Sequence, residues 1–318
     1  MDEEIKLVSV VIPVYNEADS LPDLKDRLLK ALNALSLPYE IILVDDGSKD
    51  NSLDILTRYA KEDSHIHVIE FNRNYGQHAA VFAGLKHASG DVVITMDADL
   101  QNPPEEIHKL LSKIKEGYEV VGSFRENRQD SLFRKIASRI INYIISRNLN
   151  VSIKDYGCML RAYRRPVVDA ICASKETSTF IPALADTFAK RIIEIPVAHE
   201  ERKKGTSKYN LIKLIKLQFD LMAGFSVFPL RVINFIGFII ALLGIGSAIV
   251  LLALRILFGS EWAVSGVFTL FAILFFFVGL QFIAIGVIGE YVSRIYTDVR
   301  QRPRYIVKKV YSREENAK

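Results

Sequence analysis

Cysteine and tryptophan are scarce in this chain of 318 residues, which contains two cysteines and one tryptophan. Cys158 and Cys172 do not form the spaced pairs that a zinc site requires. We therefore expect both thiols to be reduced and inert in a cytoplasmic domain. The chain also lacks internal repeats and low-complexity segments, which argues against repeat proteins and disordered linkers.

Charged residues are absent from two long stretches, Val232 to Leu254 and Val264 to Ile288. Each is longer than the roughly 20 residues that cross a bilayer core, so we expect two transmembrane helices. Two buried core helices are the alternative. Residues 1–15 are acidic and then strand-like, so no N-terminal signal peptide is expected.

Basic residues flank this pair of stretches, and Arg231 and Arg255 bracket the first one, whereas the link from Leu257 to Ala263 carries only Glu261. The flanking residues are Arg202, Lys203, Lys204, Lys208, Lys213 and Lys216 before the pair, and Arg294, Arg300, Arg302, Arg304, Lys308 and Lys309 after it. The positive-inside rule then predicts a multi-pass protein of the inner (cell) membrane with both termini in the cytoplasm. The formal net charge is only +4, but this clustering suits an anionic lipid and gives no reason to expect nucleic acid.

Residues 1–125 alternate between apolar runs of strand type and segments of helical periodicity. Strands are expected at 7–13, 39–44, 67–71, 119–124 and 191–197, with a further strand that begins at Val92 and ends in Asp97 and Asp99, and helices are expected at 18–35, 53–61, 76–87 and 104–115. This order predicts an α/β fold with a mostly parallel sheet covered by helices on both faces.

Two carboxylates, Asp97 and Asp99, end the strand that begins at Val92. Side chains alternate along a strand, so both tend to point the same way and repel each other. A divalent cation relieves this repulsion, and oxygen ligands suit Mg²⁺ or Mn²⁺. A solvated Asp-x-Asp turn is the alternative.

Polar clusters follow two further strands, Tyr15 to Glu17 after the first and Asp45 with Asp46 after the second. Ligands of parallel α/β sheets bind beyond the carboxyl ends of the strands. We expect these clusters and the Asp97 segment to converge there.

Three further segments lie between residue 131 and residue 225. Ser131 to Arg147 is amphipathic and presents Arg134 and Ser138 on one face, which is either functional or simply solvated. Residues 199–209 are expected to form a basic loop. We expect a helix at Leu211 to Phe225 that lies in the membrane interface.

Four short motifs occur in the order found in family 2 glycosyltransferases, and together they resemble that family and its GT-A, Rossmann-like fold. The motifs are Val10-Val11-Ile12-Pro13-Val14-Tyr15-Asn16-Glu17, Asp45-Asp46-Gly47-Ser48, Asp97-Ala98-Asp99-Leu100-Gln101 and Gly205-Thr206-Ser207-Lys208-Tyr209. The resemblance covers about residues 5 to 210. It is nearest to the polyprenyl-phosphate glycosyltransferases, which include dolichol-phosphate mannose synthases and bactoprenol glucosyltransferases.

This resemblance implies roles for individual residues. Donor-binding residues would be Pro13, Tyr15, Glu17, Asp45, Asp46, Asp97, Arg202, Ser207 and Lys208. Asp97, Asp99 and Gln101 would bind Mg²⁺ or Mn²⁺, and Arg134 and Ser138 would bind the lipid phosphate. Asp99, Arg125 and Asp155 complete the implied catalytic set, Arg125 as a phosphate contact and Asp155 in a region used for acceptors.

The resemblance implies a metal-dependent enzyme that transfers a hexose, with inversion, from a nucleotide sugar to polyprenyl (undecaprenyl) phosphate. UDP-glucose is the expected donor, and mannose or an aminoarabinose is the alternative. A non-catalytic membrane subunit is a further alternative. A processive polysaccharide synthase is disfavoured, because its Gln-x-x-Arg-Trp motif is absent and Trp262 lies between the two spans.

We expect four segments. They are a cytoplasmic GT-A domain at 1–210, an interfacial helix at 211–230, a transmembrane hairpin at 231–289 and a basic tail at 290–318. Spans with so few polar residues can also pack between protomers, so a homo-oligomer is compatible with the sequence.

Overall fold

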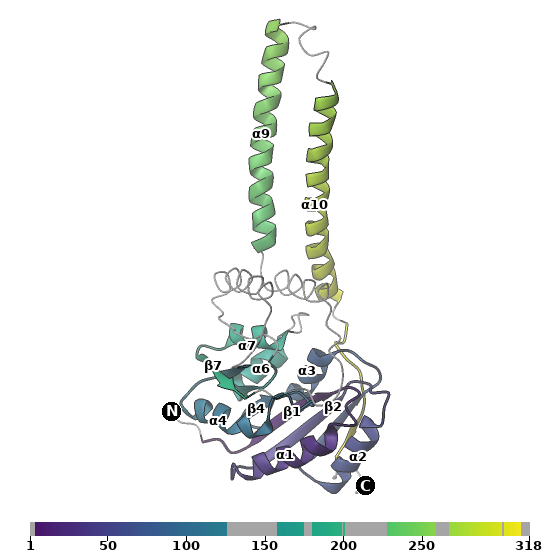
Figure 1. Ribbon diagram of the computed structural model, residues 1–318, viewed down its shortest axis with the longest axis vertical. Coiled ribbons are helices and arrows are strands. Elements are labelled where there is room, and N and C mark those ends of the chain that lie inside the picture. Colours follow the sequence, from purple (N-terminus) through teal and green to yellow (C-terminus); the bar gives the residue numbers. More distant parts are fainter. Residues whose placement is uncertain are drawn as a thin grey trace. The chain divides into compact units, whose positions relative to one another are not determined.

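The chain forms two compact units, shown in the computed structural model of Figure 1. Unit 1 comprises Met1–Asn210 together with Arg302–Lys318, and unit 2 comprises Leu211–Gln301. The structure describes residues 4–125, 158–174, 180–198, 200, 228–258, 267–300 and 302–312. The helices predicted at 131–147 and 211–225 therefore lie outside the described residues.

The described part of unit 1 contains eight strands and seven helical segments. The strands are β1 (Val8–Val14), β2 (Tyr39–Asp45), β3 (Ile66–Phe71), β4 (Val92–Thr95), β5 (Val120–Arg125), β6 (Arg161–Arg164), β7 (Ile192–Val197) and β8 (Val307–Tyr311). The helices are α1 (Leu21–Asn33), α2 (Ser52–Glu62), α3 (Gln77–His87), the 3₁₀ turn η1 (Pro104–Glu106), α4 (Ile107–Lys115), α6 (Arg165–Ala173) and α7 (Ile181–Phe188).

One sheet contains all eight of these strands, in the order β7-β5-β6-β4-β1-β2-β3-β8. The pairs β4–β1, β1–β2, β2–β3 and β5–β7 are parallel, whereas β6 and β8 run antiparallel to their neighbours. The mostly parallel α/β sheet predicted from the sequence is confirmed. The sequence analysis missed β6, β8, α6 and α7.

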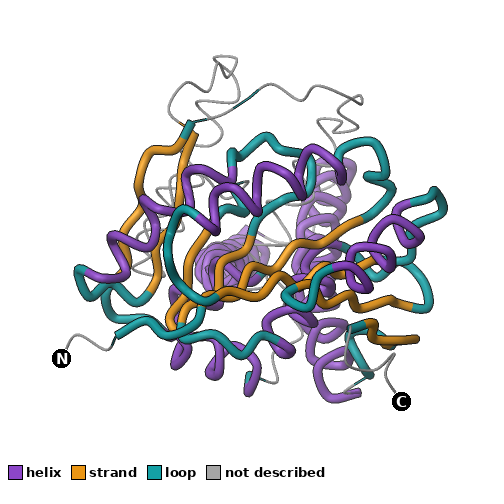
Figure 2. The backbone as a smooth tube through the Cα atoms, turned by 90° about the horizontal axis from the view of Figure 1, so that it is seen from below, coloured by secondary structure: helices purple, strands orange, loops and turns teal. Residues whose placement is uncertain are grey.

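Helices cover both faces of this sheet (Figure 2). One hydrophobic core joins it to α1, α2 and α4, and a second core joins it to α3, α6 and α7. Residues of β1 alternate between the two cores, with Val10 in the first and Val11 in the second. A strand covered on both sides has no polar face, which is why the strand sequences are nearly continuous apolar runs.

The segment predicted as a basic tail, 290–318, has a different structure. The helix α10 continues to Arg300, and β8 pairs antiparallel with β3 at the edge of the sheet. Buried Glu70 of β3 accepts hydrogen bonds from Lys308 Nζ at 2.5 Å and from Tyr311 OH at 2.7 Å. The strand thus covers an edge that would otherwise expose unpaired main-chain groups, and its lysine pairs with a buried carboxylate.

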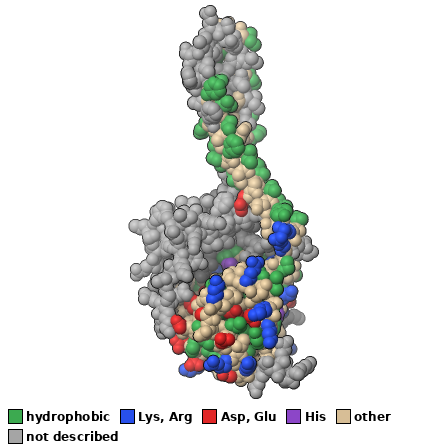
Figure 3. All heavy atoms as spheres, turned by 90° about the vertical axis from the view of Figure 1, so that its right-hand side faces the viewer, with side chains coloured by type: hydrophobic (Ala, Val, Ile, Leu, Met, Phe, Trp, Pro, Cys, Tyr) green, Lys and Arg blue, Asp and Glu red, His purple; other side chains and the backbone are tan. Residues whose placement is uncertain are grey.

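Unit 2 contains two long helices, α9 (Phe228–Phe258) and α10 (Val267–Arg300). Their apolar side chains are widely exposed, as for Phe238 and Phe282, and Figure 3 shows such side chains along a helix of this unit. By length and composition, one segment of the described residues can cross a membrane, namely Phe276–Thr297 in α10. The apolar segment of α9, Ile233–Gly244, is shorter than a full span.

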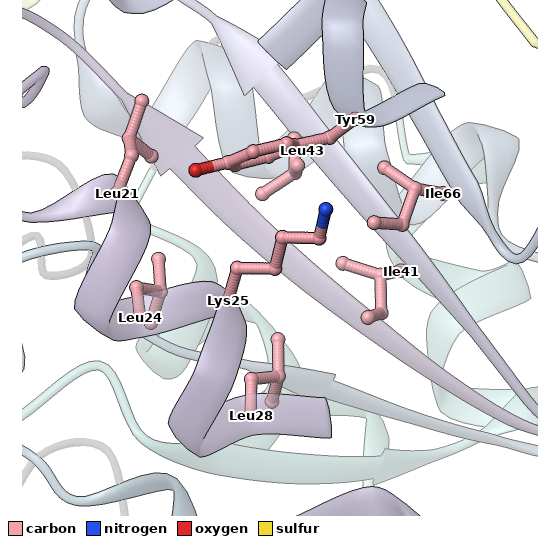
Figure 4. A pocket seen from close by; sticks show the side chains of 8 residues that line it. All are labelled: Leu21, Leu24, Lys25, Leu28, Ile41, Leu43, Tyr59 and Ile66. Carbon is pink, nitrogen blue, oxygen red and sulfur yellow. The ribbon is translucent and has the colours of Figure 1, made fainter. Parts of the chain in front are cut away.

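A small apolar pocket lies under α1 in unit 1 (Figure 4). Its lining residues are Leu21, Leu24, Lys25, Leu28, Ile41, Leu43, Tyr59 and Ile66. The Lys25 ammonium lies 4.1 Å from the centroid of the Tyr59 ring and pairs with Glu62 at 3.0 Å. The pocket has no polar cluster that could orient a ligand, and we assign it to packing.

Gly84 tests the packing of α3 on the sheet. A Cβ atom at this position would clash with the Val11 side chain of β1. We expect Gly84→Ala to destabilise unit 1 by about 1–3 kcal/mol by overpacking, although alanine favours a helix by about 1 kcal/mol. Thermal unfolding of the purified protein measures this. Adding Val11→Ala should restore part of the loss, and a stable single variant would show that α3 can move away from β1.

Candidate functional site

The carboxyl ends of β4, β1 and β2 lie side by side, because these three strands are adjacent and parallel. Pro13 lies within β1, with Tyr15 and Glu17 just after the strand. Asp45 ends β2 and Asp46 follows it, while Asp97, Asp99 and Gln101 follow β4. The structure therefore brings together the polar segments that the sequence analysis predicted to converge.

The loops after β1 and β2 are joined by hydrogen bonds from main-chain N–H groups to side-chain oxygens. Asn16 N–H donates to Ser48 Oγ at 3.1 Å, and Asn16 Oδ1 accepts from Lys49 N–H at 2.7 Å. Glu17 N–H donates to Ser52 Oγ at 3.0 Å. Asn16 has a positive φ of 55°, a conformation that asparagine tolerates better than most residues. These contacts fix the position of Glu17 relative to Asp45.

Asp45 and Asp46 are both buried, but their carboxylates have different partners. Asp46 accepts the N–H groups of Tyr75 at 2.6 Å and Gly76 at 2.9 Å, one on each oxygen. It thereby anchors the connection between β3 and α3. Asp45 Oδ2 accepts Ser48 N–H at 3.2 Å, whereas its buried Oδ1 has no hydrogen-bond partner among the described residues.

Burial raises the pKa of both carboxyl groups. Hydrogen bonds oppose the rise, from the Ser48 side chain and main-chain N–H groups for Asp45 and from main-chain N–H groups for Asp46. For Asp45, the charge of Glu70 adds to the increase in pKa. A buried acceptor oxygen without a partner is costly unless a ligand supplies a donor. Asp45 is therefore the better candidate for a ligand contact, and Asp46 holds the loop.

The loop after β4 is held at several points. Gln77, at the start of α3, donates its Nε2–H to Asp97 Oδ1 at 2.5 Å. Asp99 Oδ1 accepts Gln101 N–H at 3.1 Å, and Gln101 O accepts Glu200 N–H at 3.0 Å. Leu100 has a positive φ of 61°, which costs on the order of 1–3 kcal/mol for such a residue and persists only where surrounding contacts impose it.

A divalent cation fits the donor set of this loop. Asp97, Asp99 and Gln101 are half-buried and offer hard oxygen atoms within five consecutive residues. Across the described residues, no group of three or more His, Cys, Asp and Glu side chains forms a complete metal cage. Two carboxylates and an amide instead suit an ion whose remaining ligands come from a bound diphosphate.

Arg125 is the one further predicted site residue within the described part of the chain. Arg125 ends β5, on the same sheet. Arg134, Ser138, Asp155, Arg202, Ser207 and Lys208 lie outside the described residues. Sequence reasoning missed Gln77 and Glu200, both of which contact the loop after β4. No motif marks either residue, because each reaches the loop only through the folding of distant segments.

A buried charged group lies behind the end of β4. Arg161 of β6 is opposite Thr95 in the sheet, is fully buried, and its Nη2 lies 3.5 Å from Glu194 Oε1 of β7. Asp186 of α7 is also buried and interacts electrostatically with both. Burial raises the pKa of Asp186 to about 6, the charge of Glu194 adds to the rise, and Arg161 opposes it.

The family model described as "Glycosyl transferase family 2" matches residues 9–172. The chain belongs to this family. It is 58% identical over 316 residues to an undecaprenyl-phosphate 4-deoxy-4-formamido-L-arabinose transferase of Yersinia pestis, covering 99% of this chain and 97% of that protein. The same-named protein of Yersinia enterocolitica is 57% identical over 314 residues, covering 98% of this chain and 96% of the relative.

Among solved structures, the chain resembles glucosyl-3-phosphoglycerate synthase from Mycobacterium tuberculosis in complex with Mn²⁺, UDP and phosphoglyceric acid. The TM-score is 0.52 at 18% identity, over 69% of this chain and 77% of that one. This likeness supports the GT-A fold alone. The family model and the relatives confirm the predicted family, its polyprenyl-phosphate subgroup and the prediction that this glycosyltransferase is an enzyme.

Asp186→Asn tests the charge balance of the buried group. Because the pKa of Asp186 is higher in the folded chain, the folded state binds more protons between about pH 4 and pH 6, and stability falls as pH rises through this window. Asparagine does not titrate. The variant should therefore gain about 2 kcal/mol relative to wild type between pH 4.5 and pH 7.5. Thermal unfolding at the two pH values measures this, and an equal effect at both would contradict it.

Proposed function

We propose that this glycosyltransferase moves 4-deoxy-4-formamido-L-arabinose from a nucleotide-linked donor to undecaprenyl phosphate at the cytoplasmic face of the membrane. The observation that carries the proposal is the 58% identity, over 99% of the chain, to a relative named for that transfer. Glucose was the sugar expected from the sequence. The aminoarabinose alternative agrees better with the relatives. The transferred sugar is then a pentose and not the hexose that was expected.

In this proposal Asp97, Asp99 and Gln101 hold Mg²⁺ or Mn²⁺ beside the diphosphate of the donor. When bound, the ion supplies positive charge against the negative charge that grows on the leaving diphosphate. Gln77 keeps the Asp97 carboxylate oriented through a neutral amide, which leaves its negative charge in place. Asp99 is proposed as the principal carboxylate of the ion site. Positive charge from Arg125, Arg202 and Lys208 is proposed to complete the neutralisation of the phosphate charge.

The nucleotide is proposed to bind across the loops after β1 and β2. Pro13, Tyr15 and Glu17 would line the base and ribose, and Ser207 would close against the donor. The buried Oδ1 of Asp45 supports a role as acceptor for an N–H or O–H group of the nucleotide. Asp46 is not assigned to the nucleotide, because both its oxygens already accept main-chain N–H groups.

The acceptor chemistry requires little from the protein. A phosphate monoester has a second pKa of about 6 and is already anionic near neutral pH. Its oxygen can therefore attack the anomeric carbon in line, with inversion, without a general base. Arg134 and Ser138 are proposed to hold this phosphate, and Asp155 to lie on the acceptor side.

The membrane part of the proposal retains two spans, one in each long helix. At 1.5 Å per residue, the 31 residues of α9 and the 34 of α10 give lengths of roughly 46 and 51 Å, more than a hydrocarbon core of about 30 Å. The chain leaves unit 1 before Leu211 and returns to it at Arg302. An even number of crossings satisfies this connectivity, which supports a hairpin with both flanking segments in the cytoplasm.

The decisive experiment is a donor panel with purified protein, undecaprenyl phosphate and Mn²⁺. The donors are the UDP-linked forms of 4-deoxy-4-formamido-L-arabinose and glucose, together with GDP-mannose, and mass spectrometry identifies the glycolipid. We expect product from the formamido-arabinose donor.

Asp99→Ala should lower the rate at least about 100-fold, because it removes a carboxylate from the proposed ion site. Glucolipid as the main product would overturn the sugar assignment, and full activity of the variant or in excess EDTA would overturn the metal assignment.

Asp45→Asn and Asp46→Asn form a matched pair that separates ligand binding from loop anchoring. Asp45→Asn should raise the KM for the sugar donor by about tenfold, because the amide can present an N–H group where the nucleotide requires an acceptor oxygen. The melting temperature should be maintained. Asp46→Asn should destabilise unit 1 by about 1–3 kcal/mol, because an amide N–H would face a main-chain N–H. Donor kinetics and thermal unfolding of both variants test this. The reverse pattern would exchange the two roles.

A further inference from the structure

Arg27 of α1 connects two segments that are distant in sequence and that both adjoin the loop after β4. Its Nε and Nη2 donate to Glu105 of η1 at 3.0 and 2.9 Å. Its Nη1 and Nη2 donate to Glu200 at 3.1 and 2.8 Å. Arg27 and Glu105 are 78 residues apart, and Arg27 and Glu200 are 173 residues apart.

Both residues whose carboxylates contact Arg27 are connected to Gln101, Glu105 through the chain and Glu200 through a hydrogen bond. Glu105 lies four residues after Gln101, in the same connection between β4 and α4. Glu200 donates its own N–H to Gln101 O at 3.0 Å. Arg27 therefore fixes one end of this connection through Glu105 and holds, through Glu200, the residue that contacts its middle.

A contribution to stability alone does not account for this arrangement. All three side chains are partly exposed, at 26% for Arg27, 52% for Glu105 and 37% for Glu200, and exposed ion pairs contribute little to folding. Its geometry is more specific than that of a simple surface pair, because one planar guanidinium binds two carboxylates with four hydrogen bonds. Arrangements of this kind fix orientation.

The loop that these residues hold has a conformation that requires support. Leu100, between Asp99 and Gln101, has a positive φ that L-residues rarely adopt. The Asp99–Gln101 hydrogen bond is internal to the loop and moves with it. The Glu200–Gln101 hydrogen bond instead joins the loop to a separate segment.

We infer that the Arg27–Glu200 pair is a positioning device for the Asp99–Gln101 loop and sets the affinity for a divalent cation and a nucleoside diphosphate. This inference rests on the proposed function, because it assumes that Asp99 and Gln101 hold the ion. Neither Arg27 nor Glu200 contacts the ion in this assignment. They act through the main chain of Gln101, as outer contacts of metal ligands generally do.

The test measures Mn²⁺ binding directly, by the EPR signal of free Mn²⁺, on the full-length purified protein with and without UDP. Arg27→Met and Glu200→Ala should each weaken Mn²⁺ binding in the presence of UDP by about tenfold. The double variant should be no weaker than Arg27→Met alone, because Arg27→Met already removes the pair with Glu200. Donor KM should rise in parallel, while the melting temperature stays within about 2 °C of wild type.

Lys25→Met is the matched control, because it removes a partly exposed ion pair with Glu62 from the same helix without touching the loop. It should bind Mn²⁺ as wild type does. If Arg27→Met or Glu200→Ala does not fold, Arg27→Lys and Glu200→Gln replace them, and each should weaken binding at least about threefold.

Two results would overturn the inference, and they are distinguishable. Wild-type Mn²⁺ affinity in the variants, or losses that add in the double variant, would refute the positioning role and leave the proposed function intact. Absence of Mn²⁺ binding to wild-type protein in the presence of UDP would instead refute the metal assignment itself, and the positioning role with it.

Discussion

Parallel pairing of β4, β1 and β2 is the constraint on which the site depends. It aligns three carboxyl ends and so gathers Asp45, Asp46, Asp97 and Asp99 at one edge. Gathered carboxylates repel one another, and the fold must hold them without cancelling their charge. The main-chain N–H groups on Asp46 and the Gln77 amide on Asp97 do this, because both are neutral donors.

The C-terminal strand adds a second constraint. Because β8 pairs with β3, the chain after α10 returns to the sheet that it left before α9. Buried Glu70 requires Lys308 and Tyr311, since an isolated carboxylate at 4% exposure would be costly. The same contacts that close the edge of the sheet therefore hold the segment after α10 within unit 1.

Most of unit 1 up to residue 125 was predictable because its signals are local. Strands buried on both faces read as apolar runs, and Leu21, Leu24, Leu28 and Leu32 mark the buried side of α1. The short β6 contains two arginines and resembles a loop, because nothing in its sequence reveals that Arg161 is buried beside Glu194. The lysines of β8 likewise suggested a basic tail. Their structure depends on partners distant in the sequence, β4 and β5 for β6 and β3 for β8, which a local pattern cannot report.

The same limit applies inside the site. The Asp-x-Asp pair was visible as a motif, whereas Arg27 and Glu200 look like ordinary surface charges until their shared hydrogen bonds are seen. Their relation to Gln101 is purely three-dimensional. Sequence motifs therefore identify groups that contact ligands more readily than groups that orient them.

Asp186 shows that the cause of a perturbed pKa has to be identified before the residue is given a chemical role. A value of about 6 is typical of a general base. Yet Asp186 is only 7% exposed, and burial is the main cause of the increase in its pKa. Its charged neighbours, Arg161 and Glu194, are core residues of the sheet. A phosphate monoester acceptor is already ionised and requires no proton abstraction, so the chemistry creates no need for such a base. We therefore assign Asp186 to the charge balance of the core, and the transfer to electrostatic positioning at the ends of β1, β2 and β4.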